Sequence, residues 1–322
     1  MRKSAKVLTG ALVTAGVAAG VAAAAAGGLV LFASRRMPAG YQRKMDEKRD
    51  RKEKNSRYAD VLETSRDWLR SQSMEEVEIT SADGLKLKGH LLLHPETKRT
   101  VLLLHGWRVR WDQYMGVFAR SLYEQGCSVL LAEQRACGQS EGTFLTFGVK
   151  ERYDCQRWAE YLAERFGREM PLYLAGLSMG AATVLMAADL ALPPSVRGLI
   201  ADSGFTSAHE VIASVMHSNL HLPEWPILPL ANRVSHTYAG FGYDDCSTID
   251  TLRGSKIPVL FIHGDADDFV PLAMTLENYL ACAAPKELLI VEGAGHAGSF
   301  YVDPEACSNA FKKFFARFDD KK

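Results

Sequence analysis

The stretch "YLAGLSMGAAT", residues 173–183, decides the fold of this chain. It holds the pattern G-x-S-x-G around Ser178, which is informative where a buried strand leads into it and a helix leaves it. Leu172 to Ala175 is a short apolar run of strand length, and Ala181 to Leu192 is rich in helix-favouring Ala, Leu and Met. The two glycines of the pattern suit a sharp turn in which backbones approach closely. The sequence therefore predicts that Ser178 occupies a strained turn between a strand and a helix.

Further apolar runs of strand length indicate a sheet around this turn. Two of them, "EVEIT" and "LKLKGHLLL", flank Asp83 and Gly84, a dipeptide typical of hairpins. Helical patterns separate the later runs, and continuous apolar strands that alternate with helices are typical of a parallel sheet covered on both faces. We therefore expect an α/β fold with a mostly parallel, eight-stranded sheet. The later runs are "TVLLLHG", "SVLLAEQR", "PLYLAG", "VRGLIAD", "IPVLFIHG" and "ELLIVEG", with helices at about 112–125, 147–166, 179–192, within 206–252, at 272–282 and at 304–318.

Candidate acid and base residues follow the last two predicted strands. The segment "HGDADDFVP" supplies aspartates, and "EGAGHAGSF" supplies a histidine further along the chain. A serine hydroxyl attacks a carbonyl only when a base takes its proton, and His296 is the candidate base. A carboxylate must anchor the other ring nitrogen, and Asp265, Asp267 and Asp268 compete for that role. Asp267 is favoured because it opens the turn into the next helix, with Asp268 second. A metal site in this acidic cluster is the minor alternative.

The segment "LLLHGWR" ends an earlier predicted strand and leads into another tight turn. We expect this turn to direct a backbone N–H, that of Trp107, towards Ser178. Together with the N–H of Met179, at the start of the helix after the serine, it would form a two-donor oxyanion hole. The side chain of His105 is interpreted as structural, because only the backbone of this turn is needed for the chemistry.

Six segments in this order resemble the serine α/β-hydrolase family that holds bacterial esterases and serine aminopeptidase-like proteins. They are "HGW", "EQRACGQSEG", "GLSMG", "DSGFTS", "HGDADDFVP" and "GAGH". The similarity covers about residues 75–318. Cys137 departs from the family, whose members often carry histidine there, and this change bears on the shape of the pocket wall. The resemblance implies an α/β-hydrolase fold, hydrolysis and no cofactor or metal, but it says little about the substrate.

Three functions are compared on this basis. The favoured one is a serine hydrolase that cleaves carboxylic esters or thioesters through an acyl-enzyme, with Ser178 as nucleophile, His296 as base and Asp267 orienting His296. The first alternative is a serine aminopeptidase, which would need acidic groups near the serine to hold a free amino terminus. Glu224 is the one acid in the stretch "HLPEWPILPLANR". The second alternative is a catalytically inactive hydrolase fold used as a binding module.

About fifty residues separate "DSGFTS" from "IPVLFIHG", more than a single crossover helix requires. The resemblance places a cap insertion here, at about 206–252, and the Pro-, Leu- and Trp-rich stretch within it favours a small apolar lid. A buried crossover helix followed by a long loop is the alternative. An apolar lid favours a small-molecule acyl ester of some lipophilicity as the substrate.

The first 36 residues differ in kind from the rest. Val7 to Ser34 contains no charged residue and is long enough to span a bilayer, so residues 1–36 are predicted to be a single membrane-anchoring helix. A signal peptide that is cleaved before secretion is the alternative. The excess of Lys and Arg after the span favours a cytoplasmic body. Gly16 and Gly20 form a small-xxx-small pair that could pack two helices in a homodimer. Residues 37–72 are expected to form a charged stalk and an amphipathic helix, and residues 73–322 the catalytic domain.

The zero net charge of the chain hides an asymmetry. Residues 1–57 hold 13 Lys/Arg and 4 Asp/Glu, whereas the remaining residues hold 25 and 34. An acidic body argues against nucleic acid as a partner. The six cysteines show neither the paired spacing of a metal site nor the density of a disulfide scaffold, and we interpret them as reduced thiols.

Overall fold

The computed structural model describes residues 20–319, and these form an eight-stranded sheet with the strand order β1-β2-β4-β3-β5-β6-β7-β8. β1 and β2 form an antiparallel hairpin, and β2 also pairs antiparallel with β4. Every later pairing is parallel, so the mostly parallel eight-stranded sheet is confirmed. The strands are β1 (Glu75–Thr80), β2 (Lys86–Leu92), β3 (Arg99–Leu104), β4 (Cys127–Ala132), β5 (Leu172–Leu177), β6 (Val196–Asp202), β7 (Val259–Gly264) and β8 (Lys286–Val291).

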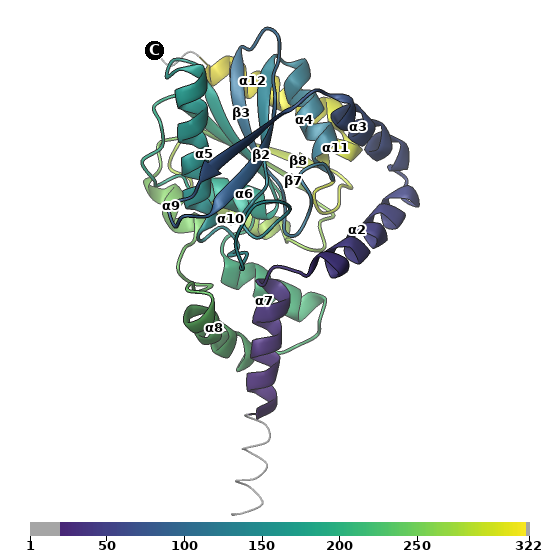
Figure 1. The fold of residues 1–322 in the computed structure, drawn as a ribbon, viewed down its shortest axis with the longest axis vertical. Coiled ribbons are helices and arrows are strands. Elements are labelled where there is room, and N and C mark those ends of the chain that lie inside the picture. Colours follow the sequence, from purple (N-terminus) through teal and green to yellow (C-terminus); the bar gives the residue numbers. More distant parts are fainter. Residues whose placement is uncertain (1–19, 320–322) are drawn as a thin grey trace, which may run out of the picture.

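Helices cover both faces of this sheet (Figure 1). Successive side chains of a strand point to opposite faces, and β3 shows the consequence. Leu102 and Leu104 pack in one core cluster, with Trp158 of α5, whereas Val101 and Leu103 pack in a second cluster, with Phe118 of α4. The helices of the body are α4 (Met115–Glu124), α5 (Glu151–Phe166), α6 (Met179–Met186), α9 (Thr248–Gly254), α10 (Leu272–Ala281), α11 (Ser299–Val302) and α12 (Pro304–Phe318).

The helix after the G-x-S-x-G turn is shorter than predicted. α6 ends at Met186, six residues before the expected end at Leu192. The chain then passes through a turn towards Pro193 and Pro194. These prolines prevent a helix from continuing beyond Leu192, but the helix already ends before the turn at 187–189.

The segment expected to hold a cap forms three helices, α7 (Ala208–Ser218), α8 (Ile227–Tyr238) and α9. α9 packs against α6 and α10, so it acts as the crossover helix on the sheet. α7 and α8 stand apart from the sheet, next to the helical segment 20–33 (Figure 1). The segment therefore contains both a crossover helix and a separate helical pair, whereas the sequence presented these as alternatives.

The membrane anchor predicted for residues 1–36 is wrong. Within residues 20–319, the structure holds no helix that is both long and apolar enough to cross a bilayer. Residues 1–19 of the predicted span, including Gly16 of the small-xxx-small pair, lie outside the described residues, so the homodimer stays a prediction. The described part is helical over 20–33, and Ala26, Val30 and Ala33 are buried in one cluster with Met216 of α7. Small side chains let this helix pack closely against other parts of the protein. The prediction had instead assumed that these side chains contact lipid.

The charged stretch after this helix also lies against the protein. It forms α2 (Ala39–Lys54), followed by α3 (Ala59–Ser71), which packs on α4 as an amphipathic helix. Asp46 and Glu53 of α2 are buried, and each pairs with an arginine: Asp46 with Arg110, and Glu53 with Arg66. These acids hold α2 on the body, so α2 is more than a solvated stalk.

Candidate active site

Ser178 lies on the tight turn between β5 and α6. Its backbone has φ 56° and ψ −116°, a conformation that residues with a Cβ rarely adopt. A Cβ on Gly176 would lie 2.2 Å from the carbonyl oxygen of Gly180. A Cβ on Gly180 would lie 2.2 Å from the carbonyl oxygen of Leu104, at the end of β3. Both glycines are therefore required by close backbone approach, and the turn they allow holds Ser178 at the carboxyl edge of the sheet.

Ser178, His296 and Asp267 form one hydrogen-bonded series. Ser178 Oγ lies 2.9 Å from His296 Nε2, and His296 Nδ1 lies 2.8 Å from Asp267 Oδ2. Because an ionised carboxylate can only accept, Nδ1 carries the ring proton, and Nε2 is left to accept the proton of the serine hydroxyl. The three residues come from turns after β5, β8 and β7, which end at the same edge of the sheet. The arrangement can transfer a proton from Ser178 to the imidazole of His296.

Asp267 is the one aspartate of its turn that reaches the histidine. Its side chain is fully buried, and its Oδ1 accepts hydrogen bonds from the backbone N–H groups of Phe269 and Val270, each at 2.9 Å. Burial alone would raise the pKa of Asp267, but hydrogen bonds from two histidines hold it well below its usual value. Asp265 instead accepts a hydrogen bond from Gly293 N, at 2.7 Å, and both Asp265 and Asp268 are exposed.

The second histidine on Asp267 is His263, which sequence reasoning did not assign to the site. It is fully buried at the end of β7, and its Nε2 lies 3.2 Å from Asp267 Oδ2 and 3.0 Å from the carbonyl oxygen of Val270. Because both of these groups are acceptors, Nε2 carries a proton. A histidine that ends an apolar strand four residues before the acid is the sequence signal that could have identified it.

Asp202 is a second buried acid beside these residues, and it too was missed. It ends β6, and its Oδ1 accepts hydrogen bonds from Ser203 Oγ at 3.0 Å and Ser299 Oγ at 3.2 Å. Burial raises the pKa of Asp202 to about 6, more than the serine hydrogen bonds and the nearby His263 and His296 lower it. An aspartate that ends an apolar run, as in "VRGLIAD", was the available sequence signal.

The two predicted oxyanion donors belong to segments that adjoin Ser178. A Cβ on Gly106 would lie 3.4 Å from Ser178 Cβ, so the loop that continues into Trp107 passes directly beside the serine. Met179 is the first residue of α6, where backbone N–H groups have no acceptor within the helix. The N-terminus of α6 therefore directs the positive end of a helix dipole towards the serine.

The buried side chain of His105 braces the turn before Trp107. His105 Nδ1 lies 2.8 Å from the carbonyl oxygen of Gly106, and His105 Nε2 accepts a hydrogen bond from Gln134 N at 3.1 Å. Burial lowers the pKa of His105, which favours the neutral ring that this pairing requires. This is the structural role expected for the side chain.

A cluster of apolar side chains connects the residue after the serine with α7 and α8. Met179, next to Ser178, belongs to a core cluster that also contains Phe205, Met216 of α7, Leu228 of α8 and Val270. Cys137, at the position where the resemblance led us to expect histidine, is buried in the same cluster. Its burial raises the pKa of the thiol to about 12, so Cys137 contributes packing without charge. The six cysteines are all buried and unpaired.

Comparisons with known proteins support the fold. A family model described as "Serine aminopeptidase, S33" matches residues 95–250. The uncharacterized protein YqkD of Bacillus subtilis is 28% identical over 257 residues, which cover 77% of this chain and 83% of YqkD. The structure of the esterase Pf2001 of Pyrococcus furiosus has a TM-score of 0.64 and 26% identity, and the match covers 78% of this chain and 93% of that chain.

These matches support a serine α/β-hydrolase family for this chain. They agree with the resemblance inferred from the six segments, and the α/β-hydrolase fold is confirmed. Est1E of Butyrivibrio proteoclasticus, solved with ferulic acid bound, has a TM-score of 0.59 over 76% of this chain and all of its own. At 22% identity, Est1E supports the fold alone. The family and its esterase members support hydrolase activity for this chain.

Proposed function

We propose that this chain is a serine hydrolase that cleaves carboxylic esters through an acyl-enzyme intermediate. The observation that carries the proposal is the hydrogen-bonded series from Ser178 Oγ through His296 to Asp267. A serine hydroxyl is a weak nucleophile until a base takes its proton, and this series supplies a base whose other nitrogen is anchored. Residues 73–322 would form the catalytic domain, with α7 and α8 as its cap.

The proposed reaction uses each group of the site in turn. Ser178 Oγ attacks the ester carbonyl as its proton passes to His296 Nε2, and the carboxylate of Asp267 stabilises the imidazolium that forms. The negative charge on the carbonyl oxygen would be held by the backbone N–H groups of Trp107 and Met179. His296 then protonates the leaving alcohol. Water, deprotonated by the same histidine, releases the acyl group and restores Ser178.

The surroundings of the serine favour a lipophilic acyl group. The apolar cluster around Met179 reaches from Phe205 to the two cap helices, so an acyl chain leaving Ser178 in that direction would meet apolar side chains. A small-molecule ester with a chain of several carbons would therefore bind better than an acetate ester, by about 0.8 kcal/mol for each buried methylene. Thioesters would react by the same route.

Hydrolysis of p-nitrophenyl butyrate tests the proposal. We expect the full chain to release p-nitrophenol and Ser178→Ala to lose at least about 1000-fold in kcat/KM. Ser71→Ala, at the exposed end of α3, is the matched control and should keep full activity. Labelling of Ser178 by a fluorophosphonate gives an independent readout, since it requires an activated serine. Equal hydrolysis by Ser178→Ala would refute the proposal, and absent labelling would favour an inactive binding module.

A serine aminopeptidase is the second candidate, because the matching family model carries that description. Such an enzyme needs an acid beside the serine to hold a free amino terminus. Glu224 is half exposed, and its Oε1 lies 3.1 Å from His209 Nε2. An aminoacyl-p-nitroanilide assay beside simple esters separates the two candidates. A preference for the anilides that Glu224→Gln abolishes would favour the aminopeptidase.

A further inference from the structure

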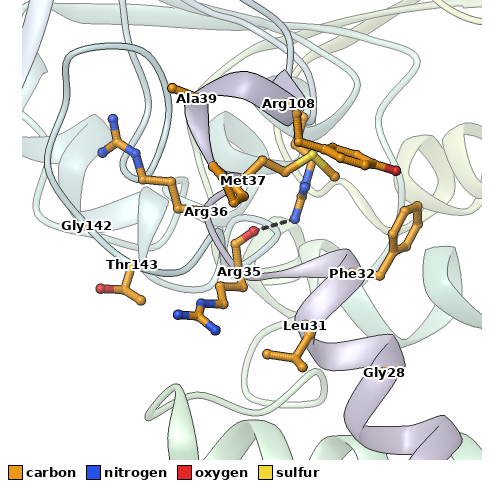
Figure 2. Close-up of a pocket in the computed structure, with 12 residues that line it drawn as sticks. Gly28, Leu31, Phe32, Arg35, Arg36, Met37, Ala39, Arg108, Gly142 and Thr143 are labelled. Carbon is orange, nitrogen blue, oxygen red and sulfur yellow. Dashed lines mark hydrogen bonds between the residues drawn. The ribbon is translucent and has the colours of Figure 1, made fainter. Parts of the chain in front are cut away.

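A cavity beside the N-terminal segment is lined by other residues than the catalytic series. It has a volume of about 790 Å³, which is within the usual range for small-molecule sites. Its walls come from residues 28–41, from Arg108 and from the loop at 142–143, as Figure 2 shows. Ser178, Asp267 and His296 are not among its lining residues. The cavity therefore has to be considered as a site of its own.

The walls of this cavity combine apolar and cationic side chains. The apolar part includes Leu31, Phe32 and Met37. The cationic part consists of three arginines, Arg35, Arg36 and Arg108. Among the residues that the structure describes, none of those lining the cavity is acidic. Residues 1–19 contain no Asp or Glu either. The residues that line the cavity therefore carry a net positive charge.

Among the three arginines of the cavity, Arg108 is the one that indicates a ligand. Its side chain is almost fully buried, and Nη2 donates one hydrogen bond to the carbonyl oxygen of Arg35 at 2.5 Å. Its Nε and Nη1 have no hydrogen-bond partner within residues 20–319. Burial lowers the pKa of Arg108 to about 10, and the neighbouring Arg49 adds a like charge. A buried cation without a counter-ion is costly, so its position calls for a partner.

Arg135, which is buried, and Arg99, which is partly buried, show how this chain pairs other guanidinium groups. Arg135 pairs with Asp154 at 2.6 Å and with Asp83 at 2.9 Å, and Arg99 pairs with Asp319 at 2.5 Å. The chain thus satisfies these guanidinium groups with carboxylates. Arg108 has a backbone carbonyl, the face of the Trp107 ring at 4.9 Å and an adjoining cavity, but no acid, where Arg135 has two acids.

We propose that this cavity binds a carboxylate joined to an apolar body, such as a medium-chain fatty carboxylate, with Arg108 as its counter-ion. The guanidinium matches a carboxylate through two parallel N–H groups, and Leu31, Phe32 and Met37 would cover the apolar chain. Protein atoms cover the unpartnered nitrogens at present, so binding requires the Arg108 side chain to rotate into the cavity. The rotation exchanges one carbonyl contact for a two-point ion pair.

This site does not depend on the proposed hydrolysis. It can therefore be measured in the Ser178→Ala protein, in which no acyl-enzyme forms. Calorimetric titration of the full chain with sodium decanoate is the test. We expect saturable binding that Arg108→Met weakens about tenfold or more, since the variant keeps an unbranched, flexible side chain and removes the guanidinium group with its charge. Arg120→Met, on the exposed face of α4, is the matched control and should bind decanoate like the parent protein.

Two further probes and one further variant make the test decisive. Sodium acetate should bind at least about tenfold more weakly than decanoate, because it lacks the apolar body, and decyltrimethylammonium should not bind, because its charge is wrong. Leu31→Glu changes a half-exposed lining residue, so it should fold normally and still weaken decanoate binding. Decanoate binding that is unchanged in both Arg108→Met and Leu31→Glu would overturn the proposal. If acetate bound as tightly as decanoate, the proposed contact between the apolar chain and Leu31, Phe32 and Met37 would be overturned.

Discussion

His263 Nε2 lies 3.2 Å from Asp267 Oδ2, the same oxygen that lies 2.8 Å from His296 Nδ1. The acid of the candidate site is therefore held between two imidazoles, one fully buried and one that also reaches Ser178. His263 does not touch the serine, so it can act only by positioning Asp267. Its other nitrogen, Nδ1, lies 2.7 Å from Thr275 Oγ1, which fixes the ring on both sides.

Replacing His263 tests this positioning role. We expect His263→Phe to lower kcat for p-nitrophenyl butyrate about tenfold or more with little change in KM, because Asp267 would lose a donor that holds its carboxylate in place. His263→Gln keeps an N–H donor and should restore part of the rate. A merely structural role would instead lower the melting temperature and leave kcat of the folded fraction unchanged, and that result would contradict the assignment.

The choice among the three aspartates gives a second prediction. Asp267→Asn should lower kcat about 10⁴-fold, because an amide can no longer hold His296 in the tautomer that accepts the serine proton. Asp268→Asn alters an exposed neighbour in the same turn and should keep nearly full activity. Steady-state kinetics on one ester substrate decide the matter. Comparable losses in the two variants would show that the site does not use Asp267 alone.

The sheet and the meeting of the three side chains could be predicted from the sequence. Apolar runs alternating with helical patterns specify a parallel sheet, and parallel strands place their carboxyl ends at one edge. Residues that follow β5, β7 and β8 must therefore approach one another. The choice of Asp267 over Asp268 rested on weaker grounds, because a single residue within one turn decides which carboxylate faces inward.

The packing of the N-terminal segment could not be predicted in this way. A run of uncharged residues satisfies the requirements of a membrane span and those of a helix buried against protein, and composition does not distinguish the two. The decisive contacts are long-range, such as the hydrogen bond of 2.8 Å from Trp107 Nε1 to the carbonyl oxygen of Ala33. His263 and Asp202 were missed for a different reason, since a polar residue that ends an apolar strand does not by itself reveal what its side chain contacts.

The close approach at the serine turn makes Gly176 a sensitive position. A Cβ there would lie 2.2 Å from the backbone of Gly180, and neither segment can move without displacing Ser178. We expect Gly176→Ala to lower the free energy of unfolding by at least about 2 kcal/mol and to reduce activity in the folded fraction. Gly254→Ala is the matched control, because a Cβ at the end of α9 would meet no atom within 4 Å. Urea denaturation of both variants measures the difference, and equal midpoints would contradict the expected clash.

Burial of Asp202 predicts how the stability of this protein changes with pH. Its pKa is about 6 in the folded chain and about 3.8 when exposed to water, so the folded state binds the proton more tightly than the unfolded state. Below about pH 4, Asp202 therefore does not lower the free energy of unfolding. As the pH rises towards 6, its ionisation in the folded chain lowers the free energy of unfolding progressively. The full cost is about 3 kcal/mol at pH 7, from a shift of about two units.

Asp202→Asn removes this titration while keeping an oxygen for Ser203 and Ser299. We expect the variant to gain stability relative to the parent between pH 4 and pH 6 and to hold that gain to pH 8. Urea denaturation of both proteins at several pH values measures the difference, and any constant offset from the new amide cancels in its slope. A difference that stays flat from pH 4 to pH 8 would show that the carboxyl of Asp202 titrates alike in the folded and unfolded chains.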